Sequence, residues 1–127
     1  MALSSDSLRK DLMKVSHGEH FFAAPEEGIY SPEVTRLVYG ELLRQAERLL
    51  ERGESVVLDA SWTSADDRAR ARLSALDKHA ALVEVECVLD EAVAKERIAR
   101  RLATMFDPSD ATVEVYDHLA ARADAWP

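Results

Sequence analysis

A single carboxylate at the end of a short apolar run is the residue with the clearest chemical potential. Val56, Val57 and Leu58 form the run, and Asp59 ends it before a stretch of small polar residues. A run this short and uniformly apolar is typical of a strand in a parallel sheet, where ligands bind at the carboxyl ends of strands. Asp59 can then hold a cation or a cation-bound water. The alternative is an aspartate that only opens a turn or precedes a helix.

A second polar group lies near the N-terminus, where Asp6 is followed closely by Arg9 and Lys10. Apolar residues at helical spacing predict an amphipathic helix over residues 6 to about 15, capped by Ser5 or Asp6. Taken alone, the pattern indicates a capping aspartate with solvated basic side chains.

Arginines recur on two later helices. Ser64 begins a capping-box pattern that predicts a helix to about residue 77, and Arg68 is its arginine nearest the preceding strand. Asp90 is expected to cap the next helix, on which Arg97 and Arg101 lie four residues apart and point the same way. Two guanidiniums on one face suit a planar anion such as phosphate, although salt bridges to acidic side chains are their commoner fate.

The remaining elements complete an alternation of helices and strands. They are the end of a strand at residues 1–4, a loop at 16–30, a long helix at 31 to about 52, a second strand at 81–89 and a last helix, capped within 107–110, that ends near 123. His17 and His20 fall in the loop without a nearby third ligand, so surface positions are expected rather than a metal site. This order predicts an α/β domain with a parallel pair of strands.

Composition limits the classes of protein that the chain can belong to. Its 127 residues fit one domain, and a net charge of −8 disfavours a nucleic-acid partner. Cys87 is the only cysteine, which excludes an intrachain disulfide and favours a reducing compartment. No apolar run reaches the length of a membrane span, so we expect a cytoplasmic protein without a membrane partner.

Several motifs in the same order and spacing resemble the kinase-like P-loop ATP-binding proteins. This group is related to gluconate kinase and zeta toxin and is often fused behind an aminoglycoside-phosphotransferase-like domain. The resemblance covers nearly the whole chain. The motifs are Ser5-Asp6-Ser7-Leu8-Arg9-Lys10, Tyr30-Ser31-Pro32-Glu33, Gly53 to Ser61 with Arg68 following, Arg97 with Arg101, and Asp107-Pro108-Ser109-Asp110-Ala111.

The resemblance implies two catalytic carboxylates. Asp6 looks like the acid that orients the substrate hydroxyl as a base, with Arg9 and Lys10 binding the small-molecule acceptor. Asp59 looks like the carboxylate at the Mg²⁺ end of the nucleotide site, acting through a metal-bound water. The implied cofactors are therefore Mg²⁺ and ATP.

The resemblance also implies three cationic contacts. Arg68 looks like a substrate or phosphate contact, and Arg97 with Arg101 looks like the pair of lid arginines. Such a set is chemically reasonable because phosphoryl transfer needs mainly positioning and charge neutralisation around the moving group.

One departure from the family pattern is as informative as the match. The glycines are Gly18, Gly28, Gly40 and Gly53, and none of them belongs to a Gly-x-x-x-x-Gly-Lys-Ser/Thr loop. We therefore expect an incomplete P-loop NTPase-type three-layer sandwich, with parallel strands flanked by helices and with the first strand and the phosphate-binding loop missing. Residues 1–127 are interpreted as a single truncated domain that binds Mg-ATP weakly.

Two functions remain open. The first is an ATP-dependent kinase domain that transfers phosphate to a small-molecule hydroxyl when complete, and that is inactive as this chain. The second is a non-catalytic remnant that serves as a binding or assembly module. Both leave strands with unpaired edges, which favours self-association. In either case one cleft at the carboxyl edge of the sheet should collect Asp6, Asp59, Arg68, Arg97 and Arg101.

Overall fold

The computed structural model describes residues 1–13, 30–104 and 112–126, and its core is built on one long helix, α2 (Pro32–Leu50). Ser31 caps this helix through its hydroxyl, which accepts a hydrogen bond from the Val34 N–H at 3.3 Å. The apolar stripe of α2 is the most deeply buried surface of the protein, with Val38 and Leu42 fully inaccessible to solvent. Gly53, at φ 77°, ends the turn after the helix, as the sequence predicts. The capping residue and the apolar periodicity are therefore enough to predict α2 from the sequence.

Two short parallel strands pack against this helix. β1 (Ala2–Ser4) pairs with β2 (Val57–Asp59), and the register sets Ser4 opposite Asp59. The backbone N–H of Val57 also donates to the carbonyl of Met1 at 2.8 Å. The α/β class and a parallel pair of strands are confirmed, but the strand that pairs with β2 is the N-terminal strand and not the predicted strand at residues 81–89. The sheet of the described residues has these two strands alone. No three-layer sandwich is therefore present in the part of the chain that the structure describes.

The first helix, α1 (Ser5–Leu12), follows β1 without a loop. Its cap is Ser4, whose hydroxyl accepts from the Ser7 N–H at 3.4 Å, so the expected cap at Ser5 or Asp6 is wrong. The reason is that Ser4 is the last extended residue of β1, and a capping residue must itself be extended. The helix also ends earlier than predicted, and residue 15 lies outside the described residues.

Helix α3 (Ala65–Asp77) begins at Ser64 as predicted, with the Ser64 hydroxyl accepting from the Asp67 N–H at 3.3 Å. The strand predicted at residues 81–89 is wrong, because this segment has no strand structure and all of its residues are exposed. Its alternating apolar and acidic residues suit a strand, but a strand forms only against a hydrogen-bonding neighbour, and β2 pairs with β1 instead. An ion pair between Arg72 and Glu84, at 2.9 Å, links the segment to α3.

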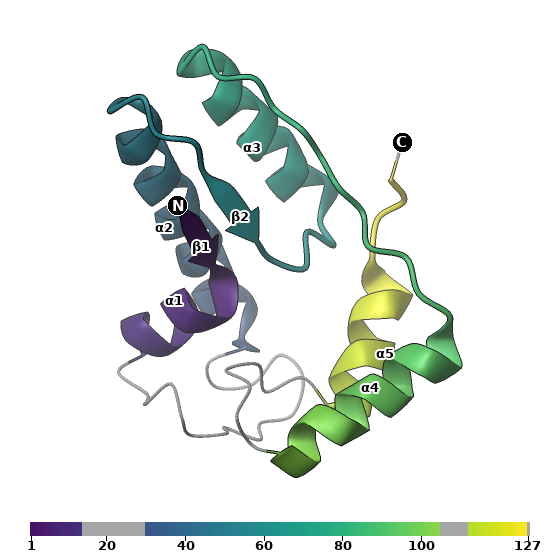
Figure 1. Cartoon of the computed structure of the whole chain (residues 1–127). Coiled ribbons are helices and arrows are strands. Elements are labelled where there is room, and N and C mark those ends of the chain that lie inside the picture. Colours follow the sequence, from purple (N-terminus) through teal and green to yellow (C-terminus); the bar gives the residue numbers. More distant parts are fainter. Residues whose placement is uncertain (14–29, 105–111, 127) are drawn as a thin grey trace.

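The last two helices form a pair across from the sheet (Figure 1). Asp90 caps α4 (Glu91–Thr104) as predicted, accepting from the Ala92 N–H at 3.0 Å. Thr112 caps α5 (Val113–Arg122), whereas the predicted cap within 107–110 lies outside the described residues. Lys95 of α4 contacts Asp117 of α5 at 2.8 Å, and its hydrogen bonds to Asp117 and Glu91 raise the pKa of Lys95.

The predicted loop at residues 16–30, with His17 and His20, also lies almost wholly outside the described residues. Within the described part of the chain, no helix combines the length and the apolar character that crossing a membrane requires.

Candidate functional site

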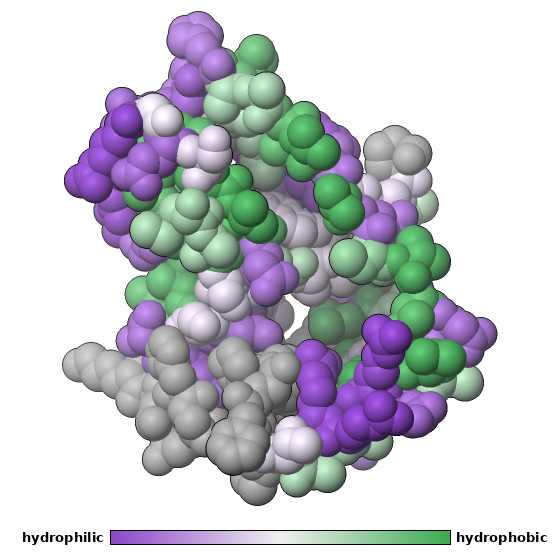
Figure 2. Space-filling model, viewed as in Figure 1, coloured by the Kyte–Doolittle hydropathy of each residue, from purple (hydrophilic) through white to green (hydrophobic). Residues whose placement is uncertain are grey.

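A cavity of about 690 Å³ opens at the carboxyl end of the two strands. Figure 2 shows the surface hollowed at this place, between the sheet and the α4–α5 pair. The described residues that line the cavity come from all five helices, from the end of β2 and from the segments that follow β2, precede α2 and follow α5. They are Ser5, Asp6, Arg9, Tyr30, Pro32, Thr35, Tyr39, Asp59, Ala60, Ser61, Thr63, Ser64, Asp67, Arg101, Val115, His118, Leu119, Arg122 and Asp124.

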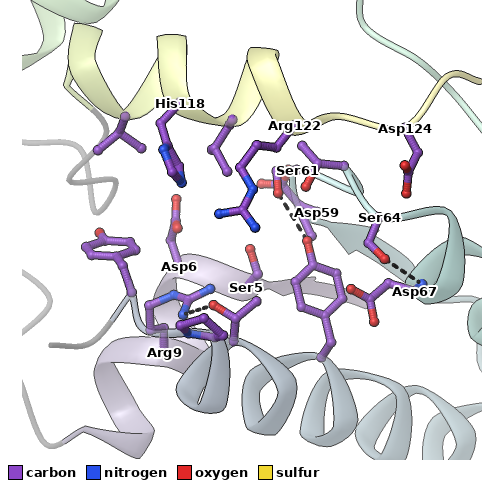
Figure 3. Close-up of a pocket in the computed structure, with 18 of the residues that line it drawn as sticks. Ser5, Asp6, Arg9, Asp59, Ser61, Ser64, Asp67, His118, Arg122 and Asp124 are labelled. Carbon is purple, nitrogen blue, oxygen red and sulfur yellow. Dashed lines mark hydrogen bonds between the residues drawn. The ribbon is translucent and has the colours of Figure 1, made fainter. Parts of the chain in front are cut away.

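The two predicted catalytic carboxylates both line this cavity, and the strand register explains why. Ser4 stands opposite Asp59, and α1 starts directly after Ser4, so Asp6 emerges at the same edge of the sheet as Asp59. Figure 3 shows Asp6 beneath the imidazole of His118, with Asp59 at the end of its strand. The convergence predicted for this pair is therefore seen, although their chemical roles stay a prediction.

Arg9 supplies a buried positive charge to the same cavity. Its side chain is only 7% exposed, its Nη1 donates to the Thr35 hydroxyl at 3.1 Å, and its guanidinium lies 5.1 Å from the centre of the Tyr30 ring. Burial lowers the pKa of Arg9, while the electrostatic effects of Tyr30 and Asp6 oppose that change. Arginine stays protonated at neutral pH nonetheless, so the group is held in place as a cation suited to binding an anion.

Tyr39 ties the turn after β2 to the core helix. Its hydroxyl lies 3.1 Å from the Ser61 hydroxyl and accepts a hydrogen bond from the Trp62 N–H at 3.1 Å. Trp62 has a positive φ of 49°, and its ring meets the Tyr39 ring edge-on at 5.2 Å. Burial raises the pKa of the Tyr39 hydroxyl, and its hydrogen bonds oppose that rise. These contacts hold Ser61 and its neighbours at the mouth of the cavity in a turn conformation that is uncommon for a bulky residue.

Among the cavity residues that α5 contributes are two basic ones that the sequence analysis did not single out. His118 and Arg122 lie four residues apart, and Figure 3 shows both reaching toward the side of the cavity where Asp6 and Ser5 lie. The sequence pattern that indicates this pair is the i, i+4 spacing, which places His118 and Arg122 on one helix face as it does Arg97 and Arg101. Nothing in the local sequence places α5 over the strand ends, so this spacing could not be assigned to the site.

The other predicted binding residues divide between the cavity and elsewhere. Arg9 and Arg101 line the cavity, whereas Lys10, Arg68 and Arg97 are not among the described residues that do. Lys10 is 1% exposed within the protein, and Arg97 is exposed on α4. The predicted convergence thus holds in part, and the roles of these three residues remain predictions without support from their positions.

Arg68 is buried near the start of α3 and is 3% exposed. Its guanidinium donates to the carbonyls of Trp62 at 2.6 Å, Ala125 at 2.9 Å and Asp124 at 3.2 Å. It also lies 4.8 Å from the centre of the Trp126 ring. These contacts direct its donors toward the C-terminal residues.

The residues of the site can be compared with what the implied Mg²⁺ and ATP require. Among the described residues no three acidic, histidine or cysteine side chains gather as a metal cage. Mg²⁺ does not need one, because it keeps several waters and binds through one or two carboxylates, a requirement that Asp59 at the cavity edge can meet. A triphosphate needs a loop of backbone N–H donors, which the glycines of the described residues do not form. Gly40 lies inside α2 and Gly53 after it, so neither builds a phosphate-binding loop of backbone N–H groups.

The arrangement defines an α/β protein with a charged ligand cavity at the carboxyl edge of a parallel sheet. The chain belongs to the family described as AAA domain, which matches residues 1–126 and is P-loop NTPase-like, as the sequence motifs indicate. The family points to a nucleotide-binding, kinase-like domain.

Relatives of the chain are uncharacterized proteins of Mycobacterium bovis and of two strains of Mycobacterium tuberculosis. Each is 39% identical over 126 residues, which are 98% of this chain and 24% of the relative. The chain thus spans about a quarter of the length of the curated relatives that it matches. No solved structure matches it.

Proposed function

We propose that the chain forms the acceptor side of a kinase-like domain that transfers phosphate from ATP to the hydroxyl of a small molecule. The observation that carries the proposal is the convergence of Asp6, Asp59 and the buried cation of Arg9 on one cavity at the strand ends. In this respect we expect it to act as gluconate kinase and zeta toxin do. Such chemistry requires positioned acids and cations more than covalent help from the protein.

The proposal gives each of these side chains a task. Asp6 accepts a hydrogen bond from the acceptor hydroxyl, orients it and takes its proton as its oxygen attacks the terminal phosphorus. Arg9 binds an anionic or hydroxylated part of the acceptor. Arg101 and Arg122, from the two helices across the cavity, neutralise charge on the transferring phosphoryl group as the bond to the leaving ADP breaks. Asp59 would hold Mg²⁺ through a bound water, and the ion would supply further charge neutralisation.

The nucleotide half of the site is incomplete in this proposal. Cationic side chains and one carboxylate can neutralise a triphosphate, but they do not preorganise it as a loop of backbone donors does. Each charge-assisted hydrogen bond is worth roughly 1.5–3 kcal/mol, so the loss of three such bonds takes a micromolar site to about millimolar or beyond. We infer that a strand, a glycine-rich loop and a helix from outside this sequence complete the site.

Calorimetric titration with Mg-ATP tests this proposal. The 127-residue chain should produce no saturable heat below about 1 mM nucleotide, whereas a chain extended with a strand, glycine-rich loop and helix from a family member should bind at about micromolar concentration. In the extended chain, Asp59→Asn should weaken binding when Mg²⁺ is present. The matched control is Arg100→Gln, an exposed residue of α4 paired with Glu96, which should leave binding unchanged.

Two results would contradict the proposal. Micromolar binding by the chain without the extension would mean that its own residues form the nucleotide site. Failure of a well-folded extended chain to bind would mean that the cavity is not one half of a nucleotide site.

A second candidate function is that of an assembly module, and one observation favours it. Residues 81–90 are all exposed, and Val83, Val85 and Val88 are each at least 75% accessible to solvent. Figure 2 shows apolar surface along the segment that leads from α3 to α4. Exposed, extended apolar segments recruit partner strands. In this alternative, copies of the chain associate through the segment without catalysing a reaction.

A further inference from the structure

The contacts of Arg68 join two parts of the chain that are more than fifty residues apart in sequence. Through Nη1 the guanidinium binds the carbonyl of Trp62, in the connection between β2 and α3. Through Nη2 it binds the carbonyls of Asp124 and Ala125, which follow α5. The face of the guanidinium lies 4.8 Å from the centre of the Trp126 ring. One buried cation therefore ties the C-terminal residues to the loop at the end of β2.

Asp124 strengthens the same junction from the other side. Its backbone N–H donates to the carbonyl of Thr63 at 2.8 Å, and its carboxylate accepts from the N–H of Ala65 at 2.7 Å. Ala65 is the first residue of α3, so the Asp124 carboxylate caps this helix beside its own cap, Ser64. A carboxylate at a helix N-terminus satisfies an otherwise unpaired donor and interacts favourably with the helix dipole.

These contacts fix the end of the helix that carries the cavity residues His118 and Arg122. α5 ends at Arg122, and Ala123, with extended backbone at φ −66° and ψ 128°, leads directly into residues 124–126. Figure 1 shows this tail leaving α5 on the side where β2 connects to α3. Arg122 is two residues from the anchored Asp124, and His118 lies one helical turn earlier. Fixing residues 124–126 therefore fixes where these side chains enter the cavity.

The geometry does not suit the role of a ligand contact for Arg68. Its guanidinium donors point at three backbone carbonyls, its flat face is covered by Trp126, and it is not among the described residues that line the cavity. A fork of donors on a planar cation can serve several carbonyls and an aromatic face at once. A lysine, with a compact ammonium group, cannot reproduce this set of contacts.

We propose that Arg68 is a positioning residue, which clamps residues 124–126 onto the loop after β2 and thereby holds α5, with His118 and Arg122, over the cavity. We call this set of contacts the C-terminal clamp. The consequence for ligand binding rests on the proposed function, whereas the clamp itself does not.

Amide hydrogen exchange of the full chain tests the clamp without any ligand. Trp126→Leu removes the aromatic face but keeps the guanidinium, and it should speed exchange in α5 about tenfold while changing α2 less than about twofold. Trp126→Phe keeps a ring and should restore most of the protection. Arg68→Gln should have a larger effect than Trp126→Leu on the same amides. Arg72→Gln, on the same helix but paired with Glu84, is the matched control and should leave α5 unchanged.

The outcomes decide the question even if Arg68→Gln fails to fold, because both Trp126 variants retain the buried cation. Unchanged exchange in α5 of Trp126→Leu, or equal loss of protection in α2 and α5, would overturn the clamp. Loss of protection in α5 that Phe restores would support it.

A titration with pyrophosphate, followed by NMR, separates this inference from the proposed function. If the cavity binds anions through Arg122, then Arg122→Gln should abolish the shifts and Trp126→Leu should weaken binding about fivefold. Weak, millimolar binding of pyrophosphate by the native chain agrees with the proposed function, whereas absence of binding well above that range would count against the role proposed for Arg122 on the phosphoryl group. The exchange result on α5 would still decide the clamp.

Discussion

The half of the molecule around α2 and the half formed by the 81–90 segment, α4 and α5 differ sharply in burial. Around α2 the core includes the fully buried Val38 and Leu42, and a basic side chain, Lys10, is packed to 1% exposure. In the other half the buried apolar residues among those described are Ile98 and Val115. The cavity lies between the halves and takes Asp6 and Asp59 from the first and His118 from the second.

This difference shows which side of the site is held by a packed core and which side is held by a few contacts to the rest of the protein. The acids and Arg9 are set by a strand register and a close-packed helix, which leave little freedom. Arg101, His118 and Arg122 stand on helices with a small buried core, so contacts such as the C-terminal clamp govern how those side chains meet the cavity. We expect the α2 half to carry most of the stability and the other half to carry the adjustable part of the function.

The largest expected effect is on the core of the α2 half. Leu42→Ala should lower the free energy of unfolding by about 2–5 kcal/mol, because it opens a cavity at a fully buried position. Ile98→Ala, in α4, should cost less, about 1–2 kcal/mol, because the surroundings can collapse more easily. Chemical denaturation of both variants measures the difference. Equal losses would show that the two halves share one cooperative core.

Tyr39→Phe probes the link between the core and the site and should cost about 1–2 kcal/mol, since it leaves the Trp62 N–H without its acceptor. The raised pKa of Tyr39 also predicts a pH effect. Above about pH 10 the unfolded phenol loses its proton while the folded one keeps it, so stability should fall as pH rises through that value.

The phenylalanine variant should lack this part of the alkaline loss. Denaturation at pH 8 and at pH 10.5 compares the two proteins. An identical pH dependence would contradict the assignment to Tyr39.

Self-association should depend on the exposed segment of the second half. Val83→Thr combined with Val85→Thr removes apolar surface without changing side-chain shape much, and should weaken association about tenfold, or roughly 1.4 kcal/mol. Leu37→Gln is the matched control, because Leu37 is 67% exposed on α2 and should not affect association. Sedimentation equilibrium measures both. A native chain that stays monomeric at all concentrations, or an equal effect of Leu37→Gln, would contradict the assembly module.

Ion pairs should show the smallest contrast between the halves. Glu41 of α2 has a side chain 17% exposed and accepts from Arg44 and from Gln45, and these bonds lower its pKa. Its stabilising contribution is present above its unfolded pKa and is lost as pH falls through its lower folded pKa. At pH 7, Glu41→Gln should cost about 0.5–1 kcal/mol, and Glu96→Gln, at an exposed pair on α4, less than about 0.3 kcal/mol. Thermal unfolding at pH 7 distinguishes the two, and a larger loss for Glu96→Gln would reverse the comparison.

Local signals predicted a large part of the fold. The caps Ser31, Ser64 and Asp90 begin helices where the sequence places them, because a capping hydroxyl or carboxylate acts on N–H groups within three residues. Asp59 ends a parallel strand, as its apolar run indicates. Features of the fold that depend only on neighbouring residues can therefore be predicted from the sequence.

Local sequence patterns thus predict the helices, the strand before Asp59 and the acids and arginines available for chemistry. Tertiary structure decided that β2 pairs with the N-terminal strand, which brings Asp6 beside the same edge and leaves residues 81–89 without a strand partner in the described structure. It also turned Arg68 toward the C-terminal carbonyls and set His118 over the cavity. These two kinds of interaction differ in the sequence distance over which they act. Capping and periodicity act over a few residues, whereas strand pairing and the burial of a cation depend on partners more than fifty residues away.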